Sequence, residues 1–414
     1  MDNYKKTVLS NGIKIISEKI PYVKSFSLGF WFNVGSRDEI RKNNGITHFI
    51  EHMLFKGTKN RSARKIAEDI ESYGGYLNAF TSKEHTCYYG RGLEQHLDRT
   101  FSVLSDMIQN PLFKENEIKK EANIIIDELN DINDNPEELI FDKFEEILFE
   151  KSSLGLPIMG TEHNIKKFRK EDLFDFIQSK YGFNNMTIAA SGAVEHEKLI
   201  KLAERYFVKD LGIKKVKKRN IEVSFCSNQI LEKPVQQMHI ILGGATYGYK
   251  DDKRTVVNVL SHILGEGSSS RLFQTVRERN GIAYQLNSFI NSFFDISTFG
   301  VYLSTNVKQA EKAENLIFNE FKKLREKAVP ERELKKAKEY IKGSLILSLE
   351  SMSSRMFRMA SSESYFDRLV SVDEMVSLID RVTSNDILEL SNALLVEDKL
   401  SKIVINPSEK NIAA

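Results

Sequence analysis

The spacing of apolar residues near the start of the chain predicts strands that lead into an amphipathic helix. Residues 14–17 and 26–32 are rich in β-branched and aromatic side chains, with Pro21 between them, as is typical of two strands. After Gly45 the apolar residues recur at helical spacing, in the order Ile46, Phe49, Ile50, Met53 and Leu54. One face of this helix is therefore expected to be buried and the opposite face to be polar.

Helical and strand patterns then follow one another without a regular order. Helical periodicity covers roughly 61–73, 93–109, 115–132 and 137–150, and strand patterns cover Tyr76–Thr81 and Thr86–Gly90. A doubly wound parallel sheet would require strands and helices to alternate one by one. The pattern instead indicates the α+β class.

The second half of the chain repeats parts of the first at an offset of about 210 residues. Residues 77–80 (Leu-Asn-Ala-Phe) return as 286–289 (Leu-Asn-Ser-Phe), and the charged segment 114–120 resembles 330–336. We therefore expect two similar duplicated domains, each a mostly antiparallel sheet packed with helices. The expected boundaries are 1–210 for the first domain, 211–224 for a Lys/Arg-rich solvated linker, and 225–414 for the second domain.

Composition excludes several classes of function. The 414 residues carry 60 Lys and Arg against 58 Asp and Glu, so the net charge of +2 provides no general attraction for nucleic acid or anionic membranes. No apolar run approaches the roughly 18 residues of a membrane span. The opening residues resemble neither a signal nor a transit peptide, and two cysteines cannot form a disulfide framework. We expect a cytoplasmic protein without nucleic-acid or membrane partners.

The strongest chemical signal is the segment His48-Phe49-Ile50-Glu51-His52. At about 100° per residue, both imidazoles and the carboxylate share the helix face opposite the apolar stripe. Two histidines four residues apart can hold one metal ion, and an adjacent glutamate can accept a proton from a water activated by that metal. This spacing predicts a catalytic metal site.

A site of this kind needs a third protein ligand, and the expected helix over 115–132 offers two candidates. Glu121 and Glu128 lie seven residues apart and therefore on nearly the same helix face, with apolar residues on both sides. Carboxylates in such surroundings face a partner or a metal more often than solvent. Spacing alone does not decide between the two.

The arrangement His48-x-x-Glu51-His52, followed by Glu121 and Glu128, resembles the inverzincin zinc peptidases of the pitrilysin/insulysin family. Similar family segments are 52–58, 74–86 and 269–284, so the resemblance covers nearly the whole chain. The length matches the two-domain subgroup that includes the mitochondrial processing peptidase and its bacterial relatives. The resemblance implies a metalloendopeptidase that cleaves peptides or unfolded segments.

The resemblance also implies roles for individual residues around the metal. His48, His52 and Glu128 would bind one Zn²⁺ per chain, and Glu51 would be the general base that activates the water. Glu121 would be a further catalytic carboxylate that orients a ligand or supports proton transfer. At the aligned positions the second half has Asn258, Ser261 and about Ser344, and only His262 matches; we expect no equivalent zinc site there.

Substrate-binding residues follow from the same resemblance. Phe55 and Phe80 would line the pocket beside the scissile bond, and the strand that contains Leu77, Asn78 and Ala79 would pair with the substrate backbone. Arg277 and Tyr284 would donate hydrogen bonds to the substrate carbonyl or oxyanion. Gly281, between them, is expected to end a helix so that Tyr284 begins a strand.

Two other functions remain open on the sequence. One is a specialised processing peptidase that removes N-terminal presequences, and the other is a non-catalytic subunit like the core proteins of mitochondrial cytochrome reductase. The chain retains the ligands, the base and the Arg277/Tyr284 pair, which favours an active enzyme and a self-sufficient homodimer. The Gly/Ser-rich segment 265–270 lacks the Gly-Lys-Ser/Thr that would make it a nucleotide-binding P-loop.

Overall fold

The computed structural model describes residues 4–208, 221, 223 and 227–408. The chain forms two compact units, each assembled from three segments. Unit 1 comprises Met1–Asn130, Leu156–Asn220 and Ser348–Leu369. Unit 2 comprises Asp131–Gly155, Ile221–Leu347 and Val370–Ala414.

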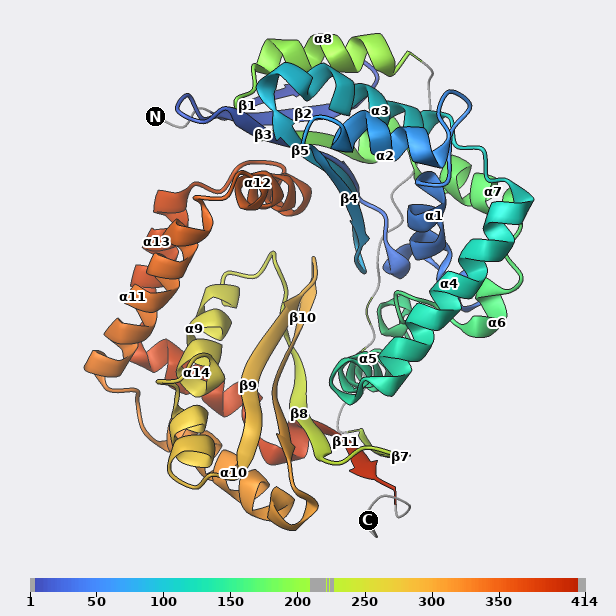
Figure 1. Ribbon diagram of the computed structural model, residues 1–414. Coiled ribbons are helices and arrows are strands. Elements are labelled where there is room, and N and C mark those ends of the chain that lie inside the picture. The colour runs from blue at the N-terminus through green and yellow to red at the C-terminus, as the bar shows by residue number, and fades with distance from the viewer. Residues whose placement is uncertain (1–3, 209–220, 222, 224–226, 409–414) are drawn as a thin grey trace. The chain divides into compact units, whose positions relative to one another are not determined.

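Unit 1 contains a six-stranded sheet with helices on both faces (Figure 1). Its strands are β1 (Tyr4–Val8), β2 (Lys14–Lys19), β3 (Ser25–Phe32), β4 (Tyr76–Thr81), β5 (Thr86–Leu93) and β6 (Met186–Gly192). They lie in the order β1-β2-β6-β3-β5-β4, and only β2 and β6 run parallel. The helices are α1 (Ile46–Leu54), α2 (Ala63–Glu71), α3 (Leu97–Gln109), α4 (Glu115–Asp134), α6 (Glu162–Ile165), α7 (Lys170–Lys180), α8 (His196–Tyr206) and α12 (Met352–Phe366).

The central strand β3 shows why this sheet is covered on both faces. Successive side chains of a strand point to opposite faces, so a strand buried on both sides reads as a continuous apolar run. In β3, Phe30 packs edge-on against Phe101 of α3, whereas the next residue, Trp31, packs against Phe357 of α12. Both β3 side chains are at most 5% exposed.

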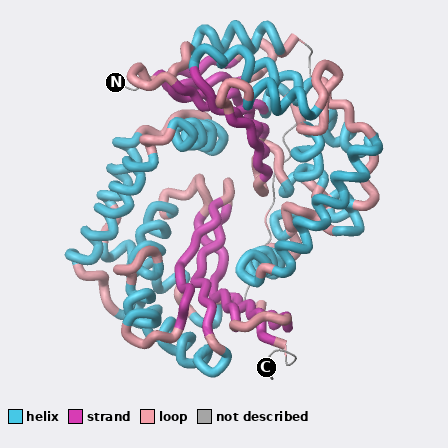
Figure 2. Tube along the Cα trace, viewed as in Figure 1, coloured by secondary structure: helices cyan, strands magenta, loops and turns pink. Residues whose placement is uncertain are grey.

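Unit 2 contains a five-stranded sheet, also with helices on both faces (Figure 2). Its strands are β7 (Asn228–Lys233), β8 (Met238–Tyr247), β9 (Ala283–Ser292), β10 (Ile296–Thr305) and β11 (Ser401–Pro407), in the order β7-β11-β8-β10-β9. Its helices are α5 (Pro136–Leu148), α9 (Arg254–Gly265), α10 (Ala310–Glu326), α11 (Glu331–Ser348), α13 (Val372–Arg381) and α14 (Ser384–Leu394). Helix α5 covers one face, where Phe141 and Phe144 contact Phe289 of β9.

Short helical turns connect these elements. In unit 1 they are η1 (Ser36–Asp38), η2 (Arg41–Asn43), η3 (Glu94–His96) and η5 (Phe183–Asn185). In unit 2 they are η4 (Ser153–Gly155), the π-helical η6 (Phe273–Glu278), η7 (Val307–Gln309) and η8 (Glu397–Lys399).

The two sheets share one topology, which confirms the expected fold class. In chain order, β2 to β6 and β7 to β11 occupy the same relative places in their sheets, and in each sheet the first and last of these strands form the parallel pair. The sheets are otherwise antiparallel. Helices α1 and α9 then correspond, since each lies between the second and third of these strands.

The sequence predicted two contiguous domains separated by a linker at 211–224. The two units of the structure differ from that division in two places. Residues 131–155, which include α5, lie in unit 2, and residues 348–369, which include α12, lie in unit 1. A division by sequence similarity alone misses this, because a helix pattern does not show which sheet its apolar face covers. Most of the expected linker 211–224 lies outside the described residues.

Among the helices of the described part, none combines the length and the apolar composition needed to cross a bilayer.

Candidate metal centre

Helix α1 presents the histidine pair because its apolar stripe is fully buried. Ile46, Phe49, Ile50, Met53 and Leu54 are at most 1% exposed, so the opposite face with His48, Glu51 and His52 is turned away from the core. The helix begins after Gly45, whose φ of 97° lies in the left-handed region that favours glycine.

Helix α4 brings the two candidate carboxylates to this face of α1. Glu121 accepts a hydrogen bond from His52 Nδ1 at 2.9 Å, and Glu128 Oε2 lies 3.5 Å from His52 Nε2. Donor atoms of His48, His52 and Glu128 all lie within 4.8 Å of one another. The two glutamates therefore have different positions. Glu128 lies with the two histidines as a candidate metal ligand, whereas Glu121 orients His52 through a hydrogen bond to its Nδ1.

Glu51 faces the edge strand β4. Its Oε2 accepts a hydrogen bond from the Thr81 hydroxyl at the end of that strand. Burial raises the pKa of the Glu51 carboxyl, and the Thr81 hydrogen bond only partly opposes this. A carboxylate with a raised pKa accepts protons more readily, as a general base requires.

The charges around the histidines favour a cation at this point. Burial, and secondarily the neighbouring His52, lower the pKa of His48 to about 3, so its imidazole is neutral. Burial also disfavours the charged form of His52, but the hydrogen bond to Glu121 and the charges of the nearby glutamates raise its pKa overall. Surroundings that attract a proton to His52 attract a divalent cation for the same reason.

The donor set fits zinc. Neutral imidazole nitrogens and one carboxylate oxygen are the ligands of many catalytic zinc sites. His52 donates through Nδ1 to Glu121, which leaves the lone pair of Nε2 available next to Glu128. His48 adds a buried ring nitrogen, Nδ1, that has no hydrogen-bond partner among the described residues.

Glu121 is itself held in place. Its second oxygen contacts Lys56 Nζ at 2.8 Å, and the residue is only 3% exposed. Although burial opposes ionisation, the bonds from His52 and Lys56 lower the pKa of Glu121, so the group stays a carboxylate. An ionised Glu121 fixes the tautomer of His52.

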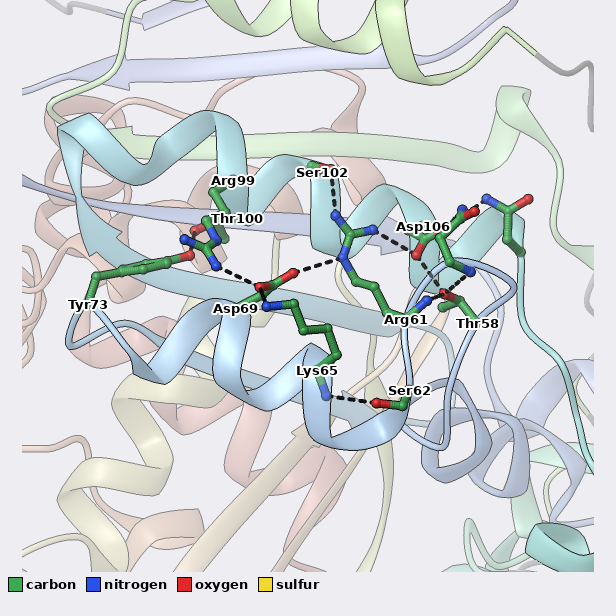
Figure 3. A network of polar contacts seen from close by, with 12 residues as sticks. Thr58, Arg61, Ser62, Lys65, Asp69, Tyr73, Arg99, Thr100, Ser102 and Asp106 are labelled. Atoms are coloured by element: carbon green, nitrogen blue, oxygen red, sulfur yellow. Dashed lines mark hydrogen bonds and ion pairs between the residues drawn. The ribbon is translucent and has the colours of Figure 1, made fainter.

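The segment that carries Lys56 is anchored by a polar network (Figure 3). Asp106 of α3 accepts hydrogen bonds from the Thr58 hydroxyl at 2.6 Å and from Arg61 Nη1 at 2.7 Å. Arg61 also donates through Nε to Asp69 of α2 at 3.1 Å. The turn that leaves α1 is therefore tied to both following helices.

The predicted substrate strand lies at one edge of its sheet. Within the described residues β4 pairs only with β5, and one edge of its backbone is left without a neighbouring strand. Leu77 is half-buried, Asn78 is exposed and Ala79 is 9% exposed. The strand is therefore placed beside Glu51 with a free hydrogen-bonding edge.

The two predicted pocket phenylalanines occupy different places. Phe55 directly follows α1, where its N–H caps the end of the helix. Phe80 packs against Trp31 and Phe357. Because side chains alternate along β4, Phe80 faces α12, whereas Thr81 faces Glu51.

Arg277 and Tyr284 lie together in unit 2. The Arg277 guanidinium lies 5.5 Å from the centre of the Tyr284 ring, and Tyr284 is 72% exposed. Gly281 has a φ of 62° and donates its N–H to the Arg277 carbonyl at 2.8 Å, after which β9 begins at Ala283. This agrees with the expected helix end at Gly281.

Sequence reasoning missed Thr81, Lys56 and Glu39. Thr81 could have been found by its alternation with Ala79 on the expected strand, and Lys56 by its place one helical turn after His52. Glu39 accepts hydrogen bonds from the backbone N–H groups of Gly45 and Thr47 at the start of α1. Nothing in the sequence pattern indicates that contact.

Two protein-family models match this chain. A family model described as "Insulinase (Peptidase family M16)" matches residues 14–162, and one described as "Peptidase M16 inactive domain" matches residues 167–341. The first match contains His48, Glu51, His52 and Glu128. The second begins after Glu128 and includes the aligned positions Asn258, Ser261 and His262.

Curated relatives match along the whole chain. An uncharacterized zinc protease, YmxG, from Bacillus subtilis is 34% identical over 410 residues, which cover 98% of each chain. An uncharacterized zinc protease from Rickettsia felis is 33% identical and covers 97% of this chain and 98% of its own. An uncharacterized zinc protease from Streptomyces coelicolor is also 33% identical and covers 94% of this chain and 87% of its own.

Solved structures share the fold. A protease from Helicobacter pylori has a TM-score of 0.93 at 22% identity and covers 98% of this chain and all of its own. A peptidase M16 inactive domain from Pseudomonas fluorescens has a TM-score of 0.91 at 19% identity and covers 98% of both chains.

Proposed function

Because the chain belongs to peptidase family M16, whose members among its relatives are named zinc proteases, we propose that it is a metalloendopeptidase that cleaves peptides or unfolded segments. The convergence of His48, His52 and Glu128 beside Glu51 carries this proposal. These three residues would hold one zinc ion per chain. Zinc would lower the pKa of water and polarise the substrate carbonyl.

Three residues of the chain would have separate roles in hydrolysis. Glu51 accepts the proton from the attacking water and later delivers it to the leaving amine. Thr81 holds the Glu51 carboxylate in position through its hydroxyl. Glu121 keeps Nδ1 of His52 protonated, so that Nε2 is free to bind the metal.

Substrate recognition is proposed to rest on backbone pairing. An extended peptide would add a strand to the free edge of β4 along Leu77, Asn78 and Ala79, which requires no particular substrate sequence. Arg277 and Tyr284 are proposed to donate hydrogen bonds to the substrate carbonyl, since Tyr284 is exposed and lies beside the guanidinium. One chain carries both motifs, which supports a self-sufficient homodimer.

The test separates metal binding from proton transfer. Glu51→Gln should keep zinc but lower kcat by about 10²–10⁴-fold on a peptide library, because an amide cannot accept the proton. His48→Ala should lose zinc as well as activity, whereas His163→Ala, which changes an exposed histidine, should change neither.

Zinc content is measured by elemental analysis and cleavage by mass spectrometry. The proposal would fail if purified wild-type protein neither contained nor took up zinc, or if the Glu51→Gln variant kept more than half of the wild-type rate.

A further inference from the structure

Unit 2 contains a cavity at the place where unit 1 has its metal centre. It has a volume of about 480 Å³ and is bounded by α9, the segment that follows α9, and the first turns of α11. Helix α9 corresponds to α1 in the shared topology, and His262 aligns with His52. The family description of this half as inactive leaves the cavity without an assigned role.

Cationic side chains line one wall. Arg332 and Lys336 of α11 both border the cavity, and with Tyr340 they lie at positions i, i+4 and i+8, within about 80° of one another around the helix. Within the described residues neither cation forms an ion pair.

The charge of Glu333, the acidic residue in the lining of the cavity, is neutralised by Arg271. Glu333 accepts two hydrogen bonds from Arg271, Nε to Oε1 at 2.8 Å and Nη2 to Oε2 at 2.7 Å. Such a two-point pair satisfies both carboxylate oxygens and cancels their charge. Arg332 and Lys336 therefore leave the lining with a surplus of two positive charges.

A buried histidine lies next to Tyr340 in the lining. His262 is 7% exposed, and its ring stacks on Tyr340 with a centroid distance of 4.4 Å and an interplanar angle of 22°. Its Nδ1 is buried and makes no hydrogen bond within the described residues, and Glu266 Oε2 lies 3.8 Å from it.

From these features we propose that the cavity binds a small oxyanion, either a phosphate or a terminal carboxylate. Arg332 and Lys336 would supply the charge and Ser269 a hydroxyl, and the ring of His262, stacked on Tyr340, would lie against the ligand. The site differs from a P-loop, because its cations come from a separate helix. It lies wholly within unit 2 and requires neither zinc nor turnover.

Binding of inorganic phosphate to the full-length zinc-loaded protein tests the proposal. Titration calorimetry should show one saturable site whose dissociation constant rises at least about 10-fold in the double variant Arg332→Gln/Lys336→Gln. Lys335→Gln is the matched control: it removes an exposed lysine of the same helix that does not border the cavity, and it should change the constant less than about 2-fold.

A second measurement locates the ligand at His262. In protein with ¹⁵N-labelled histidine, phosphate should shift the ring signals that are lost in His262→Phe, a change that keeps an aromatic ring against Tyr340. His48→Ala should bind phosphate normally, which separates this site from the metal centre. Absence of saturable binding by the wild type, or equal loss in the Lys335→Gln control, would overturn the proposal.

Competition distinguishes the two sources of the oxyanion. A short acetylated peptide acid that displaces phosphate, when its amide does not, would assign the site to a terminal carboxylate. Failure of the acid to compete would assign it to phosphate. Equal displacement by the acid and the amide would overturn recognition of a charged oxygen group. Glu51→Gln is used as the background for this arm so that the peptides stay intact.

Discussion

Glu39 shows how one buried carboxylate can fix the direction of the helix that carries the candidate metal ligands. Gly45 precedes α1 and has no side chain to cap it, and Glu39 takes over that task from outside the helix. Its oxygens accept from the N–H groups of Gly45 and Thr47 at 2.8 Å each, while the residue itself is 3% exposed. The start of α1, and with it the direction of His48, therefore depends on a group that does not touch the metal centre.

Because the pKa of Glu39 is raised, its contribution to the free energy of unfolding should decrease as the pH rises. Burial raises the pKa from 4.5 to about 7, although the bonds from Thr47, Gly45 and Asn44 oppose the shift. Between these pH values the folded protein keeps a proton that the unfolded chain has lost, so the contribution of Glu39 to stability falls as pH rises, by at most about 1.4 kcal/mol per pH unit. Below pH 4.5 the contribution is fully present.

Comparison of the wild type with Glu39→Gln isolates this contribution, because the amide does not titrate. The difference in unfolding temperature, wild type minus variant, should shrink between pH 5 and pH 7.5 in thermal scans. A difference that grows with pH would show that hydrogen bonds from the helix start outweigh burial and that the pKa is lowered instead.

At this scale the sequence predicts local geometry well and distant partners poorly. The shared face of His48, Glu51 and His52 follows from helix periodicity, and in the structure all three lie outside the buried stripe of α1. The contact between Glu51 and Thr81 depends on how a strand thirty residues later lies against α1. Periodicity within one segment contains no information about such packing.

At the scale of elements, Asp106 makes the largest number of side-chain hydrogen bonds to the connection from α1 to α2 among the described residues. Asp106 accepts four hydrogen bonds at 2.6 to 2.9 Å, from Thr58, Asn60, Arg61 and Asn110. The residue is 5% exposed, so water does not compete strongly for these bonds. Lys56, which contacts Glu121, lies in the same connection, two residues before Thr58.

Asp106→Asn should loosen the turn that leaves α1. The amide keeps the size of the side chain but loses one acceptor and the charge that faces Arg61, which should cost about 1.5–3 kcal/mol of stability. Hydrogen exchange measured by mass spectrometry should become faster in residues 56–62, and kcat/KM should fall because Lys56 no longer fixes Glu121.

Asp98→Asn is the control for this change. Asp98 lies on the same helix and pairs with Lys198, but its side chain is 54% exposed. Its loss should leave both exchange and activity unchanged. Unaltered exchange at 56–62 in the Asp106 variant would show that the turn is held by its backbone alone.

The elements themselves were predicted well where apolar periodicity is long. The strand expected at Tyr76–Thr81 has those bounds, and the helix expected over 115–132 extends to Asp134. The helix expected over 93–109 was wrong at its start, because Leu93 still belongs to β5 and a 3₁₀ turn precedes α3. Helical spacing does not distinguish a short turn from the first turn of an α-helix.

At the scale of the whole molecule, the two duplicated halves exchange one helix each. Helix α5 follows α4 and packs in unit 2, while α12 follows α11 and packs in unit 1. In unit 1, Ile16, Trp31 and Cys87 lie under Met356 and Met359 of α12, all at most 5% exposed. In each unit, a helix from the other half of the sequence covers one face of the sheet.

This exchange could not be predicted from the chain, although the duplication could. The apolar faces of α5 and α12 show that both helices are covered, but equivalent helices of a duplicated sequence fit either sheet by pattern. Which sheet each helix covers is determined by contacts between residues that are far apart in the sequence, such as Trp31 and Phe357.

The exchange predicts that the first half of the sequence does not fold by itself. A fragment of residues 1–220 would expose the apolar face around Trp31, which α12 covers in the full chain, and should bind a hydrophobic dye and unfold without a cooperative transition.

Joining residues 348–369 to the end of this fragment through a flexible linker should restore cooperative unfolding. Trp31 is the only tryptophan of the chain, so its fluorescence should shift to shorter wavelength when α12 docks. The matched control joins residues 310–326, the amphipathic helix α10 of unit 2, through the same linker and should restore neither signal. Cooperative unfolding of the bare fragment, or equal rescue by α10, would show that α12 is dispensable for the first sheet.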